Sequence, residues 1–218
     1  MALKHQTSIN RFSRETLREL YDLLASKDAD LQAIITEYGY PPLWIRPNTF
    51  ETLVLTILEQ QVSLASAYAA YQKLKERLGE ITPARLLALS DEALRSCYFS
   101  RQKMVYTRGL AQALVSGQTN LNRLEAAEDG VVRQELKKLK GIGDWTVDIY
   151  LLHALQRSDV FPTGDLALVN AIKMMKGLTS VTREEMVQMS ESWKPYRSMA
   201  TMLFWHYYIK KKNIKLLH

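Results

Sequence analysis

The sequence predicts an all-α fold, and three observations support this prediction. Apolar residues recur at spacings of three and four along most of the chain, which is typical of amphipathic helices. Capping residues and glycines separate these segments at short intervals. No segment shows the convincing two-residue alternation that is typical of a strand. We therefore expect roughly ten helices joined by short loops in a chain of 218 residues.

Capping residues divide the first half of the chain into separate helices. Asp28 precedes an apolar stripe that ends at Gly39, and Asn48 or Thr49 can cap a stronger stripe. Ser63 can cap the helix that follows, and Pro83 suits a first helical turn. Three helices are expected to begin near residues 13, 82 and 90. Four more are expected to span residues 28–38, 48–58, 64–78 and 101–115.

The second half of the chain continues this pattern. Residues 121–139 predict one long helix or a pair of helices, with a break at Glu128-Asp129-Gly130. Gly177 lies just after another apolar helix, where a helix commonly ends. The helices expected after the break span residues 145–155, 166–175, 182–189 and 196–209.

Composition limits the class of protein. Hydrophobic residues make up 47% of the chain, which is enough to bury a core. Lysine and arginine number 29 against 23 acidic residues, so the net charge of +6 favours a polyanionic partner. Cys97 is the only cysteine in the sequence, which excludes an intrachain disulfide and an iron–sulfur cluster held by four cysteines of this chain. Without an apolar leader or a membrane-length apolar run, the chain is expected to be soluble and cytoplasmic.

The stretch from Leu136 to Ile149 carries the most informative motif. Gly141-Ile142-Gly143 lies between two helical segments, and glycine can adopt the left-handed backbone that such a tight turn requires. Amides at the start of the second helix can bind a phosphate. A Gly-x-Gly turn can also do no more than reverse the chain. Lysines at 137, 138 and 140 favour the interpretation as a nucleic-acid contact.

A single acid follows this turn. Asp165 comes after Pro162-Thr163-Gly164 and directly before an apolar helix. An aspartate in that position is usually only a helix cap. A firmly held carboxylate can also stabilise an oxocarbenium-like state or activate water. We interpret the three neighbouring acids as a surface, a helical and a loop residue, respectively Asp144, Asp148 and Asp159.

Four segments in order resemble the helix-hairpin-helix DNA glycosylases. The hairpin Leu139–Thr146 and the loop Val160–Asp165 resemble that family's signature. Ile57–Ser63 and Trp193–Ala200 are similar to its 3-methyladenine DNA glycosylase II branch. The resemblance implies one domain of two small helical lobes flanking a DNA-binding cleft, without the N-terminal β-domain of some relatives. One lobe would span residues 48–135, and the other residues 1–47 with 136–218.

The resemblance also implies a reaction. Asp165 matches the family's catalytic aspartate. Relatives that also nick the strand carry a lysine nucleophile where this chain has Trp145, and tryptophan cannot form a Schiff base. The chain is therefore expected to be a monofunctional hydrolase of base excision repair, which removes alkylated purines such as 3-methyladenine and 7-methylguanine and leaves an abasic site.

Trp145 and Trp205 match two tryptophans that line this family's base pocket. Aromatic faces suit cationic alkylated bases. Ile149 and Leu166 occupy pocket positions where some relatives have tyrosine, which leaves the base preference open. Core packing is the plain alternative for both pocket tryptophans. Trp44 and Trp193 are expected to be structural.

DNA contacts follow from the same motifs. A target base must leave the stack, and Gln61 stands where some relatives insert a leucine into the gap. The residues expected to contact double-stranded DNA are Gly141, Ile142, Gly143, Thr146, Gln61 and Ser63. Further candidates for phosphate contacts are Arg101, Lys103, Arg108, Lys194 and Arg197.

No cofactor is expected to be required. In the family, main-chain carbonyls of the hairpin hold a sodium or potassium ion, and the matching positions are Lys137, Leu139 and Ile142. The chain is expected to act as a monomer without a membrane partner. Two alternatives remain: the same fold acting on deaminated or mismatched bases, or a helix-hairpin-helix protein that binds DNA without chemistry.

Overall fold

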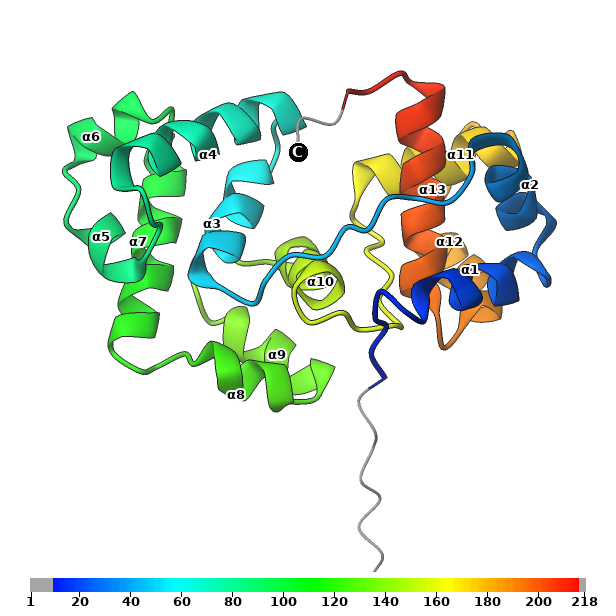
Figure 1. Ribbon diagram of the computed structural model, residues 1–218, viewed down its shortest axis with the longest axis horizontal. Coiled ribbons are helices and arrows are strands. Elements are labelled where there is room, and N and C mark those ends of the chain that lie inside the picture. Colours follow the sequence, from blue (N-terminus) through cyan, green and yellow to red (C-terminus); the bar gives the residue numbers. More distant parts are fainter. Residues whose placement is uncertain (1–9, 216–218) are drawn as a thin grey trace, which may run out of the picture. The chain divides into compact units, whose positions relative to one another are not determined.

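The computed structural model describes residues 10–215, and this part of the chain is helical (Figure 1). It contains thirteen α-helices and one short 3₁₀-helix, and no strand lies within the described residues. The β-type pairing found there is one isolated bridge between Arg11 and Arg157. The all-α prediction is confirmed. None of the helices described is long and apolar enough to cross a membrane.

The chain folds as two compact units. One, called here the terminal unit, comprises described residues 10–43 and 156–208. The other, called here the central unit, comprises residues 44–155 with the described residues from 209 onward. The sequence-based division placed 136–155 with the chain ends. The structure groups this segment with the central unit, because its helix packs on α3 (Phe50–Glu59) and α9 (Asp129–Leu136).

The central unit is built around α3, which contacts α4 (Leu64–Leu78), α7 (Arg101–Val115) and α10 (Asp144–His153). Leu53, Val54 and Ile57 of α3 are fully buried. Six of its helices begin at a residue whose side chain accepts the amide three residues later, which confirms the expected caps at Thr49 and Ser63. The remaining helices are α5 (Pro83–Leu87), α6 (Asp91–Ser96) and α8 (Leu121–Ala126).

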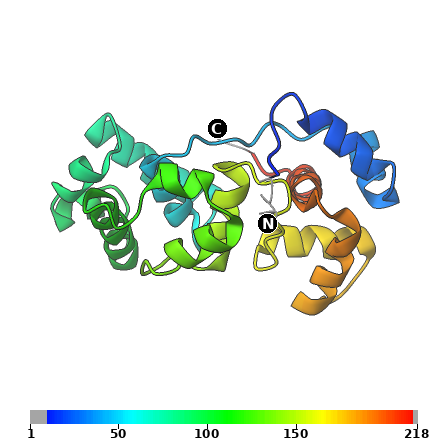
Figure 2. The same cartoon turned by 90° about the horizontal axis from the view of Figure 1, so that it is seen from below.

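The terminal unit is organised around α13 (Arg197–Lys211), which lies between the α1–α2 pair and α11 (Figure 2). Residues 198–207 of α13 are all buried, so this helix forms the core of the unit. The Tyr21 hydroxyl lies 3.6 Å from Met202 Sδ, which joins α1 to α13. The other elements are α1 (Leu17–Ala25), α2 (Ala29–Tyr38), α11 (Leu166–Lys176), α12 (Arg183–Ser190) and the 3₁₀-helix η1 (Glu191–Trp193).

Two helix boundaries refine the sequence-based prediction. The first helix begins at Leu17 rather than near Ser13, because the side chains of Ser13 and Thr16 bond each other's backbone amide in a preceding turn. The segment 121–139 forms the pair α8 and α9. The two helices are separated at Ala127-Glu128, and Asp129 and Gly130 of the expected break already belong to the first turn of α9.

Candidate functional site

The hairpin joins α9 to α10 and depends on Gly141. Leu139 and Ile142 are buried, and the Ile142 amide donates to the Leu139 carbonyl at 3.1 Å, which closes the turn. Gly141 has a φ of +87°, and a Cβ atom there would lie 2.1 Å from Cγ of Tyr106 on α7. Both the backbone and the packed Tyr106 ring therefore require glycine at this position.

The helix after the hairpin starts at an exposed glycine. Gly143 is the N-cap of α10, and no side chain caps this helix end. Amides of a first helical turn lack partners within the helix and carry the positive end of its dipole. Lys137 Nζ lies 2.6 Å from Oδ1 of exposed Asp144, which is the surface acid that the sequence predicts. This arrangement suits an anion held by backbone amides.

Gln60 links the hairpin to the end of α3. Its Nε2 donates to the Gly141 carbonyl at 2.8 Å and to the Thr146 hydroxyl at 2.9 Å. One amide group therefore holds the turn and the first turn of α10 together. The side chain of Thr146 is buried and accepts from Gln60, and its expected contact with DNA stays a prediction.

Gln61 and Ser63 lie on the exposed loop between α3 and α4. Gln61 has a φ of +56°, a left-handed backbone that few residues other than glycine adopt. Ser63 caps α4 by accepting the Ser66 amide at 3.2 Å, as predicted. Because Gln60 is the immediate neighbour of Gln61, the loop that carries Gln61 is fixed to the hairpin.

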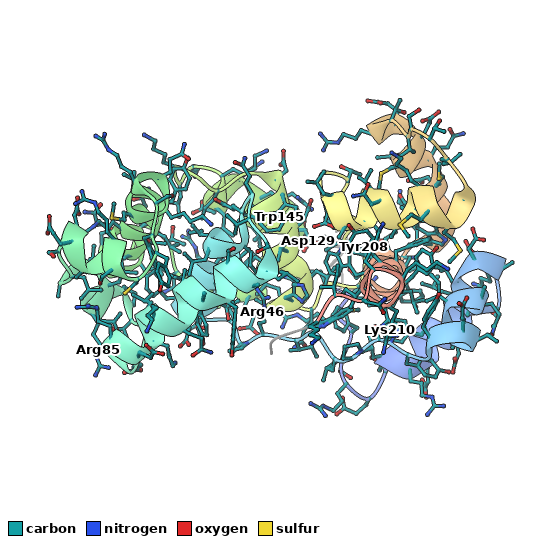
Figure 3. All side chains as sticks on the ribbon, turned by 90° about the horizontal axis from the view of Figure 1, so that it is seen from above. Arg46, Arg85, Asp129, Trp145, Tyr208 and Lys210 are labelled. Atoms are coloured by element: carbon teal, nitrogen blue, oxygen red, sulfur yellow. The ribbon has the colours of Figure 1, made fainter. Side chains whose placement is uncertain are left out.

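Trp145 stands in the first turn of α10 and is half-buried (Figure 3). Ile149, one helical turn later, is buried. Both residues belong to the central unit with the hairpin.

Asp165 belongs to the terminal unit and is the N-cap of α11, as the sequence predicts. Its Oδ1 accepts the Leu168 amide at 2.8 Å. The same oxygen accepts the indole N–H of Trp205 at 2.9 Å. Asp165 and Trp205 are both buried, whereas Leu166 is 77% exposed. The carboxyl group is thus held by two donors at a helix start, which is the firm placement that a catalytic carboxylate needs.

The other acids near these motifs are engaged in ion pairs. Buried Asp148 on α10 lies 2.5 Å from Arg133 of α9. Asp159, in the loop before Asp165, has a carboxylate that accepts two bonds from the guanidinium of Arg197, at 2.7 Å from Nε and 3.0 Å from Nη2, and one from the Arg197 amide at 3.3 Å. These contacts agree with the predicted helical and loop roles.

Most of the basic residues considered for phosphate contacts also have partners within the chain. Arg197 pairs with Asp159, and Lys194 lies 2.8 Å from Glu191. Lys103 donates to the Leu58 carbonyl, and burial lowers the pKa of its ammonium group. Arg108 donates to the Leu89 carbonyl and to Asp91. Arg101 is exposed at the start of α7 and remains a candidate.

A buried histidine supports the segment that leads into α3. The ring Nδ1 of His153 lies 2.6 Å from the Trp44 carbonyl, and the Arg46 amide donates to the His153 carbonyl at 2.9 Å. Burial, and then the charge of Arg46, lowers the pKa of His153 to about 3. Arg46 itself forms a two-point ion pair with Glu59, the last residue of α3. The neutral ring thus serves as a structural element beneath the Gln60 loop.

The helical fold of the described residues, the glycine hairpin and the buried capping aspartate are the features expected of a helix-hairpin-helix DNA repair protein. The family model of the HhH-GPD superfamily base excision DNA repair proteins matches residues 54–195, and the chain belongs to this family.

Several proteins to which this chain is similar are named as 3-methyladenine glycosylases or glycosidases. A DNA-3-methyladenine glycosylase of Bacillus subtilis is 28% identical over 77% of this chain and 59% of its own length, so the chain spans less than two thirds of that relative. The Schizosaccharomyces pombe 3-methyladenine DNA glycosylase in complex with abasic DNA is similar with a TM-score of 0.81 and 26% identity, over 89% of this chain and 97% of that one. A Bacillus halodurans DNA-3-methyladenine glycosidase is similar with a TM-score of 0.75 and 30% identity, over 94% and 95%.

The structure brings together some of the site residues that the sequence singles out. Gly141 and Thr146 meet at Gln60, and Asp165 meets Trp205. Sequence reasoning missed Gln60 and Tyr106 as supports of the hairpin. The end of the α3 stripe at Gln60 was a signal for a polar role, but nothing in the sequence connects Tyr106 with Gly141, which lies 35 positions further on.

Proposed function

We propose that this chain is a monofunctional DNA glycosylase that hydrolyses the N-glycosidic bond of alkylated purines in duplex DNA. The observation that carries the proposal is the buried carboxyl group of Asp165, held by the Leu168 amide and the Trp205 indole in a member of a base excision repair family. The names of the relatives support 3-methyladenine as a substrate.

The chemistry needs a single carboxylate. The bond between the sugar C1′ and the base nitrogen breaks, its electron pair leaves with the base, and positive charge develops on the sugar. Asp165 stabilises this charge, a water oxygen then bonds to C1′, and the proton that the water loses passes to the Asp165 carboxylate or to solvent. An N3- or N7-alkylated purine is cationic in the nucleotide and leaves as a neutral base, so its departure needs no proton from an acid.

The residue at position 145 supports hydrolysis without strand cleavage. Trp145 has no amine that could form a Schiff base with the sugar. The resemblance to the family supports Trp145 and Trp205 as aromatic residues for a cationic base. The same resemblance supports Ile149 and Leu166 as base-pocket positions, and the side chain of Leu166 is exposed.

The hairpin supports binding to double-stranded DNA. Backbone amides at Gly141, Ile142 and Gly143 would hold a phosphate, while exposed Gln61 and Ser63 would contact DNA beside the flipped base. Gly141→Ala should weaken binding to undamaged duplex at least tenfold, because it displaces the Tyr106 ring. Gly109→Ala on α7, where a Cβ meets nothing within 4 Å, is the matched control. Equal affinities of the Gly141→Ala and Gly109→Ala variants for duplex in a fluorescence titration would show that the hairpin does not contact DNA.

The hairpin also fits a monovalent cation. Neutral main-chain carbonyls suit sodium or potassium, whose hydration shell such oxygens can replace. The Leu139 carbonyl accepts one hydrogen bond and keeps a second lone pair for an ion. Lys137, Leu139 and Ile142 would hold the ion, which would add positive charge beside the phosphate. Replacing potassium and sodium with a large organic cation at constant ionic strength should weaken DNA binding.

The activity is tested on duplexes that each carry one defined lesion. Purified protein should release 3-methyladenine or 7-methylguanine and leave abasic sites that break only after alkali. No release of any alkylated purine would refute the favoured substrate, whereas release of deaminated or mismatched bases would support the alternative. Strand breaks without alkali would refute the monofunctional assignment. DNA binding without any base release would make the chain a binding protein.

A further inference from the structure

Trp205 makes a polar contact that base stacking does not require. The indole Nε1–H is the only hydrogen-bond donor of its side chain, and it lies 2.9 Å from Oδ1 of Asp165. Both residues belong to the terminal unit and are buried. A tryptophan that only stacks on a base uses its ring faces, so its N–H edge could point elsewhere.

Both partners of this bond are held by their surroundings. Trp205 lies within the buried run of α13, next to Phe204, whose ring is 5.3 Å from that of Trp193. Trp193 in turn lies 5.7 Å from Phe161, in the loop before Asp165. The Asp165 amide donates to the Pro162 carbonyl at 2.9 Å. The buried run of α13 therefore holds the indole, and the turn that begins at Pro162 holds the carboxyl group.

We propose that Trp205 is the positioning residue of Asp165, whose N–H fixes the orientation of the carboxylate at the start of α11. This inference rests on the proposed glycosylase function. The Leu168 amide comes from α11 and the indole N–H from α13, so donors from two elements meet at one oxygen and together fix the orientation of the carboxyl group. A carboxylate held in one orientation can stabilise positive charge that develops beside it.

The chain offers a matched control in the same unit. The Trp193 indole N–H donates at 2.8 Å to Oδ2 of Asp28, which is the N-cap of α2. Trp193→Phe removes the same kind of bond from another buried tryptophan. A loss that comes only from weakened packing or stability should therefore appear in both variants.

The first experiment measures single-turnover release of 7-methylguanine and, separately, affinity for the same duplex. Trp205→Phe keeps an aromatic ring and should lower the rate constant about tenfold while affinity changes less than threefold. Trp193→Phe should change both values less than twofold. Equal rate losses in the two variants, or a Trp205→Phe loss confined to affinity, would overturn the positioning role.

A double-mutant cycle shows whether Trp205 acts through Asp165. In an Asp165→Asn background, Trp205→Phe should change the residual rate less than twofold, because the charge to be positioned is already absent. A stacking residue would retain its full tenfold effect in that background, and such an additive result would refute the inference.

A readout independent of activity uses the indole N–H resonances of the folded protein. Trp205→Phe and Trp193→Phe identify two of these resonances by their loss. Asp165→Asn should then shift the Trp205 signal and leave the Trp193 signal in place, and Asp28→Asn should do the reverse. An unmoved Trp205 signal would refute the contact even if the chain is an active glycosylase. Failure of base release with the expected shift would refute the proposed function instead.

Discussion

The terminal unit contains two tryptophan–aspartate pairs of the same construction, and their oxygens are used differently. In each pair, a buried indole donates to an aspartate that caps a helix. Asp28 accepts two backbone amides on Oδ1 and the Trp193 indole on Oδ2. Asp165 accepts its amide and the Trp205 indole on one oxygen, Oδ1. A hydrogen bond from an indole to a capping aspartate therefore does not by itself indicate catalysis. The surroundings of the aspartate decide whether the bond also has a catalytic role.

The largest expected effect is on the rate of base release when the charge of one carboxylate is removed. Asp165→Asn should lower the rate of alkylpurine release at least 100-fold, about 2.7 kcal/mol in the barrier, because the amide still caps α11 but carries no charge. Asp28→Asn, the matched change, should stay within twofold. Single-turnover assays on one lesion duplex compare them. Similar rates in both variants would remove the distinction between the pairs.

The next effect concerns stability, where the two pairs should behave alike. Asp28→Ala and Asp165→Ala each remove a cap, which costs about 1 kcal/mol, and leave a buried indole N–H without its acceptor, which costs about 1 kcal/mol more. Urea denaturation should show a loss of about 2 kcal/mol for both. A loss confined to Asp28→Ala would contradict the shared construction.

The variants must be compared at a pH where the protein is folded, and His153 lowers the stability of the fold in acid. The pKa of His153 is lowered from 6.5 to about 3, so between these values the unfolded chain binds a proton that the folded chain does not. Stability should be complete above pH 6.5 and fall as the pH falls, by up to about 1.4 kcal/mol per pH unit. His153→Asn should flatten this slope in denaturation curves between pH 6.5 and 4. An unchanged slope would show that other groups cause it.

The smallest expected effect concerns DNA binding through the hairpin rather than the chemistry at Asp165. Gln60→Ala removes both hydrogen bonds to the hairpin and should weaken duplex binding about fivefold, or about 1 kcal/mol. Gln112→Ala on the exposed face of α7 is the control. Titration of undamaged duplex measures both. Equal affinities would show that Gln60 supports the fold of the hairpin without affecting its contact with DNA.

The sequence identifies the local parts of this molecule well. Short-range rules are sufficient for the caps at Ser63 and Asp165, because each bond joins residues three positions apart. They also place the turn at Gly141. The Trp205–Asp165 contact joins residues 40 positions apart and depends on the side-chain rotamer of a tryptophan that looks like any other core residue. The same holds for Tyr106 against Gly141, where only the packed ring shows why the glycine is required.

The neighbouring residues Gln60 and Gln61 show what a sequence motif does not predict. Gln61 is the residue that the motif singles out, and it is exposed with a left-handed backbone. Gln60, directly before it, makes the contacts to the hairpin. The residue sequence alone does not show which of two adjacent amides points inward, since α3 ends at this position and its helical period no longer applies.

The bridge made by Gln60 has a consequence for how a damaged nucleotide would be selected. One amide nitrogen fixes the loop that carries Gln61 to the turn proposed to hold a phosphate. The spacing between the held phosphate and the inserted side chain is then set within the protein before any DNA arrives. The nucleotide tested for damage would therefore always lie the same number of nucleotides along the DNA backbone from the bound phosphate, whatever the surrounding DNA sequence.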